Sequence, residues 1–214
     1  MKQRIGLMGG MFDPVHLGHL QVAMAAQLSL QLDQVRLIPC LQPNHREYPF
    51  CTPQHRLAML ELAVREHPQL TVDDAEIRRG GTSYTIDTLL EMRERFPDDS
   101  LVYILGMDAY ASLPAWHRWQ ELLDLTHFLV VTRPGYQLDA VPLMAQQLAQ
   151  RQVANAEAMF ATPQGKVMIY SELQSPVSST LVRKTIDAGR SISDLVPEAV
   201  ESYLHDHDIY RRKH

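Results

Sequence analysis

The chain has 214 residues and a formal net charge of -5, and only two of its residues are cysteines. At this length one compact domain buries about 70% of the surface that its unfolded chain exposes, so it needs neither disulfides nor a structural metal to fold. No apolar run reaches the roughly 20 residues that span a bilayer. The acidic balance argues against a general nucleic-acid binder but leaves nucleotides open as ligands. We therefore expect a cytoplasmic protein that binds neither nucleic acid nor membrane.

Short apolar runs alternate with helical patterns along the chain. Strands are expected at 4–8, 34–39, 101–105, 127–132 and 166–170, with the short segment 70–74 between two helices. Helices are expected at 20–30, 53–67, 83–96, near 107–112, around 117–123 and at 175–189, with a last helix within 197–214. This alternation predicts right-handed βαβ units and an α/β fold with a mostly parallel sheet.

No linker, internal repeat or low-complexity tract divides the chain, so a single domain over 1–214 is expected. The segment 137–165 is the least regular and is predicted to be a variable helical insertion, with a Gln- and Ala-rich helical part at 143–157. The C-terminal part, 175–214, is predicted to be helical. The polar segment 40–53 is predicted to be a loop that closes over a neighbouring site.

The stretch GGMFDPVHLGHL (9–20) follows the first strand and leads into a helix. Gly9 and Gly10 would let backbone amides approach a phosphate closely. His16 and His19 lie three apart on the first helical turn, so both imidazoles point to one side, near the positive end of the helix dipole. The pattern favours a phosphate site, although a tight turn with two exposed histidines and an H-x-x-H metal pair remain alternatives.

A second stretch, VSSTLVR (177–183), lies near the other end of the chain. Ser178, Ser179 and Thr180 offer hydroxyls and free N–H groups at a helix start, and Arg183 follows Thr180 by three residues. These groups are suited to holding phosphates. Taken alone, the stretch is more typical of a serine-rich helix cap with a solvated arginine, and only its pairing with the first stretch favours the phosphate site.

These stretches resemble known sequence signatures. HLGH (16–19) behind GGMFDPV resembles the HxGH signature of the nucleotidyltransferase superfamily related to class I aminoacyl-tRNA synthetases, and VSSTLVR resembles its second signature, ISSTxxR. In order and spacing, the chain is also similar to bacterial nicotinate mononucleotide adenylyltransferases at SYT (83–85), ILGMDA (104–109), LPAWHRW (113–119) and RPGY (133–136). The similarity runs from about residue 3 to 210 and is weakest at 137–165. It implies a Rossmann-like, doubly wound nucleotidyltransferase fold.

The resemblance implies transfer of AMP from ATP to nicotinate mononucleotide, with Mg²⁺ entering with ATP and no organic cofactor. The acceptor phosphate is already anionic, so alignment and charge stabilisation replace a general base. The implied catalytic residues are His16, His19 and Arg183. The implied ATP-binding residues are Gly9, Gly10, Phe12, Gly18, Gly106, Asp108, Ser178, Ser179 and Thr180.

For the acceptor, the resemblance implies that Trp116 stacks on the pyridine ring and that backbone amides near Thr85 and His117 take the carboxylate. A core or rim Trp and solvated surface arginines are the alternatives. The full acceptor-binding set expected is Cys40, His45, Arg46, Tyr84, Thr85, Trp116, His117 and Arg133.

Three positions depart from the family pattern. Met11 stands where the family usually has Thr or Ser, Cys40 where it has Asn, and Pro43-Asn44-His45 where it has Pro-Pro-His. The departures suggest a second hypothesis, in which zinc clamps the loop; the spacing of its ligands matches no common zinc motif. The hypothetical zinc ligands are Cys40, His45, Cys51 and His55.

Rival functions stay open on the sequence. Phosphopantetheine and glycerol-phosphate nucleotidyltransferases share the two signatures but are typically shorter and lack the Trp116 and SYT context. The acceptor could be nicotinamide mononucleotide, or the chain could be a nucleotide-binding regulator that has lost its chemistry. The sequence also leaves open whether the chain forms a homo-oligomer.

Overall fold

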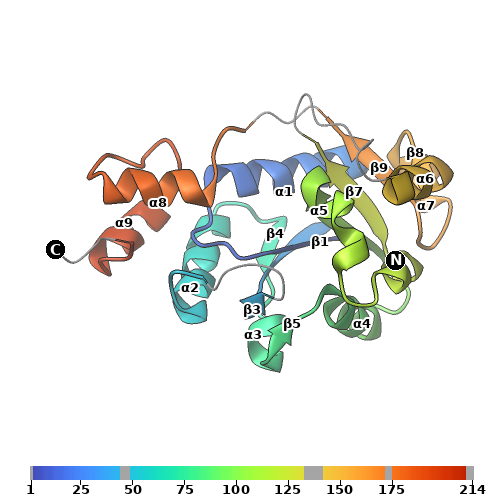
Figure 1. The fold of residues 1–214 in the computed structure, drawn as a ribbon, viewed down its shortest axis with the longest axis horizontal. Helices are drawn as coiled ribbons and strands as arrows, with labels where there is room; N and C mark the ends of the chain where they lie inside the picture. Colours follow the sequence, from blue (N-terminus) through green and yellow to red (C-terminus); the bar gives the residue numbers. More distant parts are fainter. Residues whose placement is uncertain (1, 44–48, 133–141, 172–174, 211–214) are drawn as a thin grey trace.

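The computed structural model describes residues 2–43, 49–132, 142–171 and 175–210, and its centre is a parallel sheet (Figure 1). Seven strands pair in the order β4-β2-β1-β6-β7-β9-β8, and every pairing is parallel. They are β1 (Arg4–Gly10), β2 (Gln34–Pro39), β4 (Leu70–Val72), β6 (Ser100–Gly106), β7 (His127–Val131), β8 (Gln152–Val153) and β9 (Val167–Tyr170). A separate small sheet pairs β3 (Gln42–Pro43) with β5 (Thr82–Ser83).

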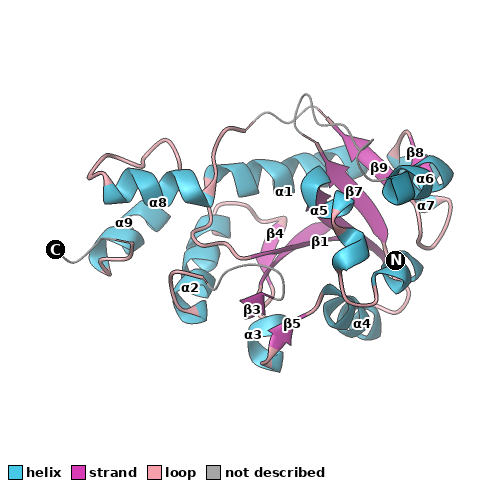
Figure 2. Cartoon of the chain, in the orientation of Figure 1, coloured by secondary structure: helices cyan, strands magenta, loops and turns pink. Residues whose placement is uncertain are grey.

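Helices connect the strands and cover both faces of the sheet (Figure 2). They are α1 (Leu17–Leu30), α2 (Pro53–Val64), α3 (Ala75–Arg79), α4 (Thr85–Arg95), α5 (Met107–Ala111), α6 (Pro142–Arg151), α7 (Ala156–Phe160), α8 (Ser179–Asp187) and α9 (Glu198–Asp206), with 3₁₀ turns at Leu113–Ala115 and Trp119–Asp124. None of the helices in the described ranges is long and apolar enough to cross a membrane.

The central strands bury both of their faces, which explains why they are almost continuously apolar. Along β6, Val102 and Ile104 pack into one core layer, which also holds residues of α1 and α2. Leu101, Tyr103 and Leu105 alternate with them and pack into the opposite layer, with residues of α4 and α5. The predicted α/β fold with a doubly wound, mostly parallel sheet is therefore confirmed.

The order of the strands reverses between β1 and β6, because the chain moves outward from β1 in both directions. At such a switch point the connecting loops diverge, and a crevice opens beyond the carboxyl ends of the two strands. Here β1 ends in Gly9 and Gly10, and β6 ends in Gly106. The sheet thus places three glycines at the edge where a ligand is expected.

The structure corrects two of the expected helices. The helical part expected at 143–157 is two helices, α6 and α7, separated by β8, which pairs with β9 at the edge of the sheet. The helix expected around 117–123 is a 3₁₀ turn at Trp119–Asp124. Besides β8, other short elements were not expected, among them α3 and the two-residue strands β3 and β5, which are too short to show a hydrophobic period.

The C-terminal helices α8 and α9 lie at the end of the molecule near α2 and the start of α1, opposite to α6 and α7 (Figure 1). The backbone N–H of Leu17 donates to the carbonyl of Leu195 at 2.9 Å, which joins the first turn of α1 to this C-terminal part. The segment after β9 therefore returns to the same edge of the sheet as the loop after β1.

A buried histidine in the sheet predicts how stability depends on pH. His127 begins β7 with no exposed surface, and burial lowers its pKa from 6.5 to about 4. In the unfolded chain His127 takes up a proton near its ordinary pKa, whereas in the folded chain it does so only at lower pH. The neutral side chain therefore makes its full contribution to the free energy of unfolding above about pH 6.5, and this contribution is lost on acidification. We expect His127 to lower the free energy of unfolding by up to about 2 kcal/mol between about pH 7 and pH 5.

Urea denaturation at the two pH values measures this change. In the control variant His127→Asn, the amide oxygen can still accept the backbone N–H of Lys166, which donates to His127 Nδ1 at 3.2 Å, but the side chain does not titrate. The variant should lose less stability on acidification than the wild type. An equal loss in both proteins would contradict the assignment.

Candidate functional site

A cavity of about 840 Å³ lies at the switch point, beyond the carboxyl ends of β1 and β6. The loop from β1 into α1, the starts of α4, α5 and α8, and the segment after β2 all contribute to it. It gathers most of the residues expected from the sequence: Gly9, Gly10, Phe12, His16, Gly18, His19, Cys40, Tyr84, Thr85, Gly106, Asp108, Trp116, His117, Ser178 and Ser179. Thr180 and Arg183 are not among the residues that line it, and His45, Arg46 and Arg133 lie outside the described residues.

The two histidines of HLGH form one unit at the start of α1. His16 is the residue that precedes the helix and His19 lies in its first turn. Their rings stack with centroids 3.7 Å apart, and the edge of Phe12 meets His19 with centroids 4.9 Å apart. Both imidazoles line the cavity, as their spacing predicts, beside the positive end of the dipole of α1.

The protonation of His19 follows from its surroundings. Burial, and then the neighbouring His16, hold the pKa of His19 well below its usual value, so the ring is neutral at pH 7. The backbone N–H of His16 donates to His19 Nδ1 at 3.3 Å. Since Nδ1 accepts a hydrogen bond, the single proton of the neutral ring sits on Nε2. His19 is therefore a fixed hydrogen-bond donor through Nε2.

Near the two histidines, neighbouring side chains lie so close to the backbone at two positions that only glycine fits. A Cβ at Gly9 would lie 2.5 Å from the hydroxyl of Tyr103, and a Cβ at Gly18 would lie 2.9 Å from the hydroxyl of Ser175 and 3.0 Å from His16 Nδ1. Any larger residue would displace a neighbour that lines the cavity. Tyr103 and Ser175 were not expected from the sequence, because neither belongs to a recognisable motif.

The start of α8 meets the loop that precedes α1. Ser178 caps the helix by accepting the backbone N–H of Leu181 at 3.2 Å, and the hydroxyl of Ser179 donates to the carbonyl of Pro14 at 2.9 Å. The hydroxyls that the sequence suggested for phosphate thus also fix α8 in place. Both serines still line the cavity.

Arg183 points to the loop before α1. It donates to the carbonyl of Asp13 at 2.6 Å, lies 3.8 Å from a carboxylate oxygen of Asp13, and stacks over the ring of Phe50 at 4.4 Å from the centroid. Its second nitrogen donates to the hydroxyl of Thr180 at 3.4 Å. In this arrangement Arg183 braces the loop that carries the histidines.

Asp13 contacts three distant parts of the chain, the segment 50–51, Arg183 on α8 and Tyr210, whereas the sequence indicated only a turn there. Its carboxylate is almost fully buried and accepts the backbone N–H of Phe50 at 2.7 Å, the thiol of Cys51 at 3.2 Å and the hydroxyl of Tyr210 at 2.7 Å. Burial raises the pKa of Tyr210 and raises that of Cys51 to about 12, so both groups stay protonated and can donate. The carboxylate charge is therefore satisfied inside the protein.

The opposite end of the cavity is aromatic. Trp116 is partly exposed and donates through its indole N–H to the hydroxyl of Ser112 at 3.3 Å. The rings of Tyr84 and His117 lie with centroids 4.7 Å apart. Tyr84 precedes α4, and Tyr84 and Thr85 line the cavity at the start of this helix, where the first backbone N–H groups have no partner within the helix. The aromatic faces and helix start expected for the acceptor thus lie together.

A buried arginine supports both sides of this cavity and was missed by the sequence analysis. Arg56, on α2, has no exposed surface, donates to the carbonyl of Met11 at 2.8 Å and to that of Leu41 at 3.2 Å, and lies 4.0 Å from Cys40 Sγ. It therefore holds the segments after β1 and β2 at a fixed separation. Only its place in an amphipathic helix was visible in the sequence.

The described members of the hypothetical zinc set do not converge. Cys51 is hydrogen-bonded to Asp13 and Tyr210, whereas His55 Nδ1 lies 2.9 Å from the hydroxyl of Tyr203. Across the described parts of the chain, no group of three or more His, Cys, Asp or Glu residues is placed to hold a metal ion. His45, the fourth member, lies outside the described residues. The structure gives the zinc hypothesis no support.

Comparison with known proteins agrees with this geometry. The cytidylyltransferase-like family model matches residues 7–185, which defines the class of the protein. The chain is 41% identical over 211 residues to a protein of Aeromonas salmonicida, covering 99% of both, and 43% identical over 215 residues to one of Pseudomonas aeruginosa strain UCBPP-PA14, covering 100% of both. Both relatives are described as probable nicotinate-nucleotide adenylyltransferases. The chain belongs to the nicotinate-nucleotide adenylyltransferase family.

Solved structures support the fold. The nicotinic acid mononucleotide adenylyltransferase of Plasmodium falciparum, complexed with NaAD, matches with a TM-score of 0.73 over 97% of both chains at 17% identity. The same enzyme complexed with APC matches with a TM-score of 0.69. At this level of identity the likeness concerns the architecture of the sheet and its helices.

The contact between Tyr210 and Asp13 predicts that Tyr210 supports the loop before α1, next to His16 and His19. Tyr210→Phe removes one donor from a buried carboxylate, which should cost about 1–3 kcal/mol of stability and lower turnover severalfold. Tyr203→Phe is a matched control, because it removes a tyrosine hydroxyl from the same C-terminal part that contacts His55 instead.

Chemical denaturation and steady-state turnover measure both variants. Tyr203→Phe should leave turnover close to that of the wild type. If the two variants lose turnover equally, general docking of the C-terminal part, and not the Asp13 contact, explains the effect.

Proposed function

We propose that this chain transfers AMP from ATP to nicotinate mononucleotide, giving nicotinate adenine dinucleotide and pyrophosphate. The observation that carries the proposal is one cavity with two unlike ends: stacked histidines and glycines at the end of β1, and an aromatic group at the start of α4. Family membership supports it, because the full-length relatives are described by that activity.

The chemistry requires positioning more than acid or base catalysis. A 5′-phosphate oxygen of the acceptor attacks the α-phosphorus of ATP, the new P–O bond forms, and the bond from the α-phosphorus to the bridging oxygen breaks as pyrophosphate leaves. The attacking phosphate is already anionic near neutral pH, so no proton has to be removed first. The protein accelerates the step by aligning the two phosphates and stabilising charge that moves onto pyrophosphate.

The triphosphate would lie along β1 and α1. Gly9 and Gly10 let the backbone approach the phosphates, and His16 and His19 line the same surface. His19 Nε2–H is the donor that we assign to the phosphate oxygens in the transition state. Ser178 and Ser179 face this end from α8, and we place Arg183 behind them, where it holds the loop and contributes positive charge.

The acceptor and adenosine would occupy the rest of the cavity. We assign Trp116 to the pyridine ring and the start of α4, at Tyr84 and Thr85, to its carboxylate. Gly106 and Asp108 line the cavity at the start of α5, where we place the adenosine.

Mg²⁺ would enter as part of the substrate, as the complex with ATP. The phosphate oxygens supply the hard ligands that this ion prefers, and the ion neutralises charge on the leaving pyrophosphate. We place the reaction in the cytoplasm, where ATP is made and used.

The role of His19 can be tested with variants that retain the hydrogen-bonding function of only one of its two ring nitrogens. His19→Asn keeps an acceptor near the position of Nδ1 but lacks a donor at Nε2, so we expect kcat to fall by at least about 100-fold with the fold intact. His19→Gln places an amide N–H near the position of Nε2 and should recover part of the loss.

Pyrophosphate release and thermal denaturation are the measurements. His205, an exposed histidine on α9, supplies the control His205→Asn, which should leave turnover unchanged. Turnover near that of the wild type in His19→Asn would contradict the role of His19.

The substrate assignment is tested by pyrophosphate release with MgATP and either nicotinate mononucleotide or nicotinamide mononucleotide at matched concentrations. We expect kcat/KM to favour the acid by at least about 10-fold, because a helix start with free N–H groups binds a carboxylate better than a neutral amide. Preference for the amide would overturn the choice of acceptor. Release with neither compound, despite ATP binding, would indicate a nucleotide-binding protein without this activity.

A further inference from the structure

A buried carboxyl group lines the cavity at its acceptor end, and the reaction scheme above gives it no role. Glu76 lies on α3 with 7% of its surface exposed, and it shares the cavity wall with Ser83, Tyr84 and Thr85. A carboxylate beside the site of an anionic acceptor would weaken binding if its charge were uncompensated. Its partners therefore decide what it does.

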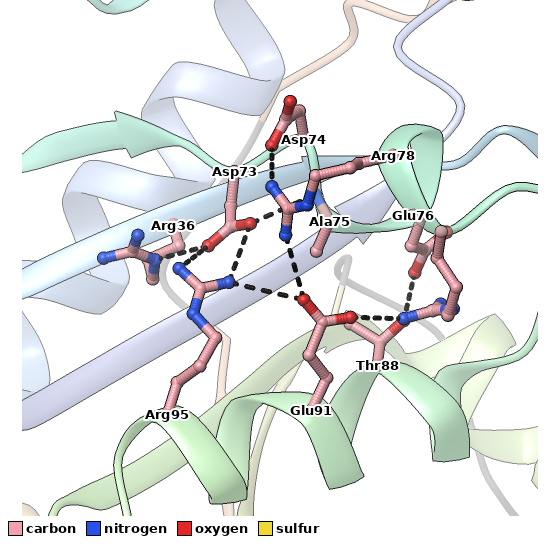
Figure 3. Close-up of polar contacts among 10 residues, drawn as sticks. Arg36, Asp73, Asp74, Ala75, Glu76, Arg78, Thr88, Glu91 and Arg95 are labelled. Atoms are coloured by element: carbon pink, nitrogen blue, oxygen red, sulfur yellow. Dashed lines mark hydrogen bonds and ion pairs between the residues drawn. The ribbon is translucent and has the colours of Figure 1, made fainter.

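Glu76 is surrounded by hydroxyl donors. Thr88, on the facing side of α4, donates to Glu76 Oε1 at 2.7 Å, and the hydroxyl of Thr88 accepts from Arg79 at 2.9 Å (Figure 3). Burial raises the pKa of Glu76, while hydrogen bonds from Thr88 and Ser83 and the charge of Arg79 favour the ionised form. The group is thus a buried carboxyl whose directional partners lie on α4 and β5.

Behind Glu76 a network of ion pairs fixes α3 against α4 and the sheet. Glu91, on α4, lies 3.1 Å from Arg78 and 2.8 Å from Arg79. Farther along, Arg95 pairs with Asp73 at 2.9 Å, and Arg36, on β2, pairs with the same carboxylate at 2.8 Å. Figure 3 shows continuous contacts from Arg36 on β2 to Glu91, and Arg79, which contacts both Glu91 and Thr88, extends them to Thr88. Glu76 is the member of this set that reaches the cavity.

On the cavity side, Ser83 connects Glu76 to the segment after β2. The hydroxyl of Ser83 accepts the backbone N–H of Leu41 at 3.0 Å, and β5 pairs with β3 through Thr82–Gln42 and Ser83–Pro43. The next residues along the chain, Tyr84 and Thr85, begin α4. A hydroxyl that contacts Glu76 and Leu41 together sets the relative position of two walls of the acceptor end.

We propose that Glu76 is a positioning residue for acceptor binding: through Ser83 and Thr88 it fixes the start of α4 and the segment 40–43 in the arrangement that accepts the pyridine end of the mononucleotide. The proposal rests on the proposed function. Because the triphosphate end is built from β1, α1 and α8, Glu76 acts on the acceptor and leaves ATP binding alone.

The test compares steady-state kinetics of Glu76→Ala, Glu76→Gln and Glu91→Gln, with each substrate varied in turn. Glu76→Ala should raise KM for nicotinate mononucleotide by about 10-fold or more, with KM for ATP within about twofold of the wild type, since it leaves two hydroxyls without their shared acceptor. Glu76→Gln keeps an acceptor oxygen and should recover most of the loss. Glu91→Gln alters the same network away from the cavity and should leave both KM values unchanged.

A second variant keeps the test decisive if Glu76→Ala does not fold. Ser83→Ala removes the hydroxyl that joins Glu76 to Leu41, so it should also raise KM for the acceptor, with KM for ATP within about twofold of the wild type. An unchanged KM for the acceptor in Ser83→Ala would overturn the proposal. So would equal changes in KM for ATP and acceptor, or an effect of Glu91→Gln as large as that of Ser83→Ala.

The wild type distinguishes failure of this proposal from failure of the function. A wild-type protein that does not use nicotinate mononucleotide contradicts the proposed function, and this proposal with it. A wild-type protein that does, together with variants whose acceptor KM is unchanged, overturns only the role of Glu76.

Discussion

The charge on the buried carboxylate of Asp13 is the constraint on which the site depends. A carboxylate removed from water needs hydrogen-bond donors, and here they come from Phe50 and Cys51 before α2, from Tyr210 and, at a longer distance, from Arg183 on α8. The loop that carries His16 and His19 therefore reaches its position only when segments up to 197 residues away in sequence have docked. The phosphate end of the cavity is a product of the tertiary fold as well as of a local motif.

The two ends of the cavity are built by different physical means. Within the described parts of the chain, none of the residues that line the cavity is Lys or Arg. The triphosphate end instead relies on glycine-permitted backbone approach, the starts of α1 and α8, and a neutral histidine with a fixed donor. The acceptor end relies on aromatic faces held by side-chain hydrogen bonds. On the proposed assignment, the first end would bind phosphates in general, and the second would select the acceptor.

The sequence predicts the parts of this design that have a local pattern. Apolar runs located the central strands, and the strand-glycine-histidine order indicated the edge of the sheet where the cavity lies, with both histidines in its lining. The contact from Tyr210 to Asp13 and the Glu76 network leave no local pattern, since they join residues from separate elements. The break between α6 and α7 was also invisible, because the residues between them lack a strong helix-breaking signal. The motif also indicated where Arg183 lies but not which group it contacts, which is the carbonyl of Asp13.

Met11 and Cys40 are the departures from the family pattern that line the cavity. The structure explains why the segments after β1 and β2 keep their positions with these residues. Their main-chain groups make the supporting contacts: the carbonyl of Met11 accepts from Arg56 at 2.8 Å, and the N–H of Cys40 donates to the carbonyl of Gly10 at 2.9 Å. Neither contact depends on the side chain. What changes is the surface offered to the acceptor, where a thioether and a thiol replace stronger hydrogen-bonding groups. On the proposed assignment, recognition of the acceptor therefore depends more on ring stacking and on the start of α4, which we propose that Glu76 holds in place.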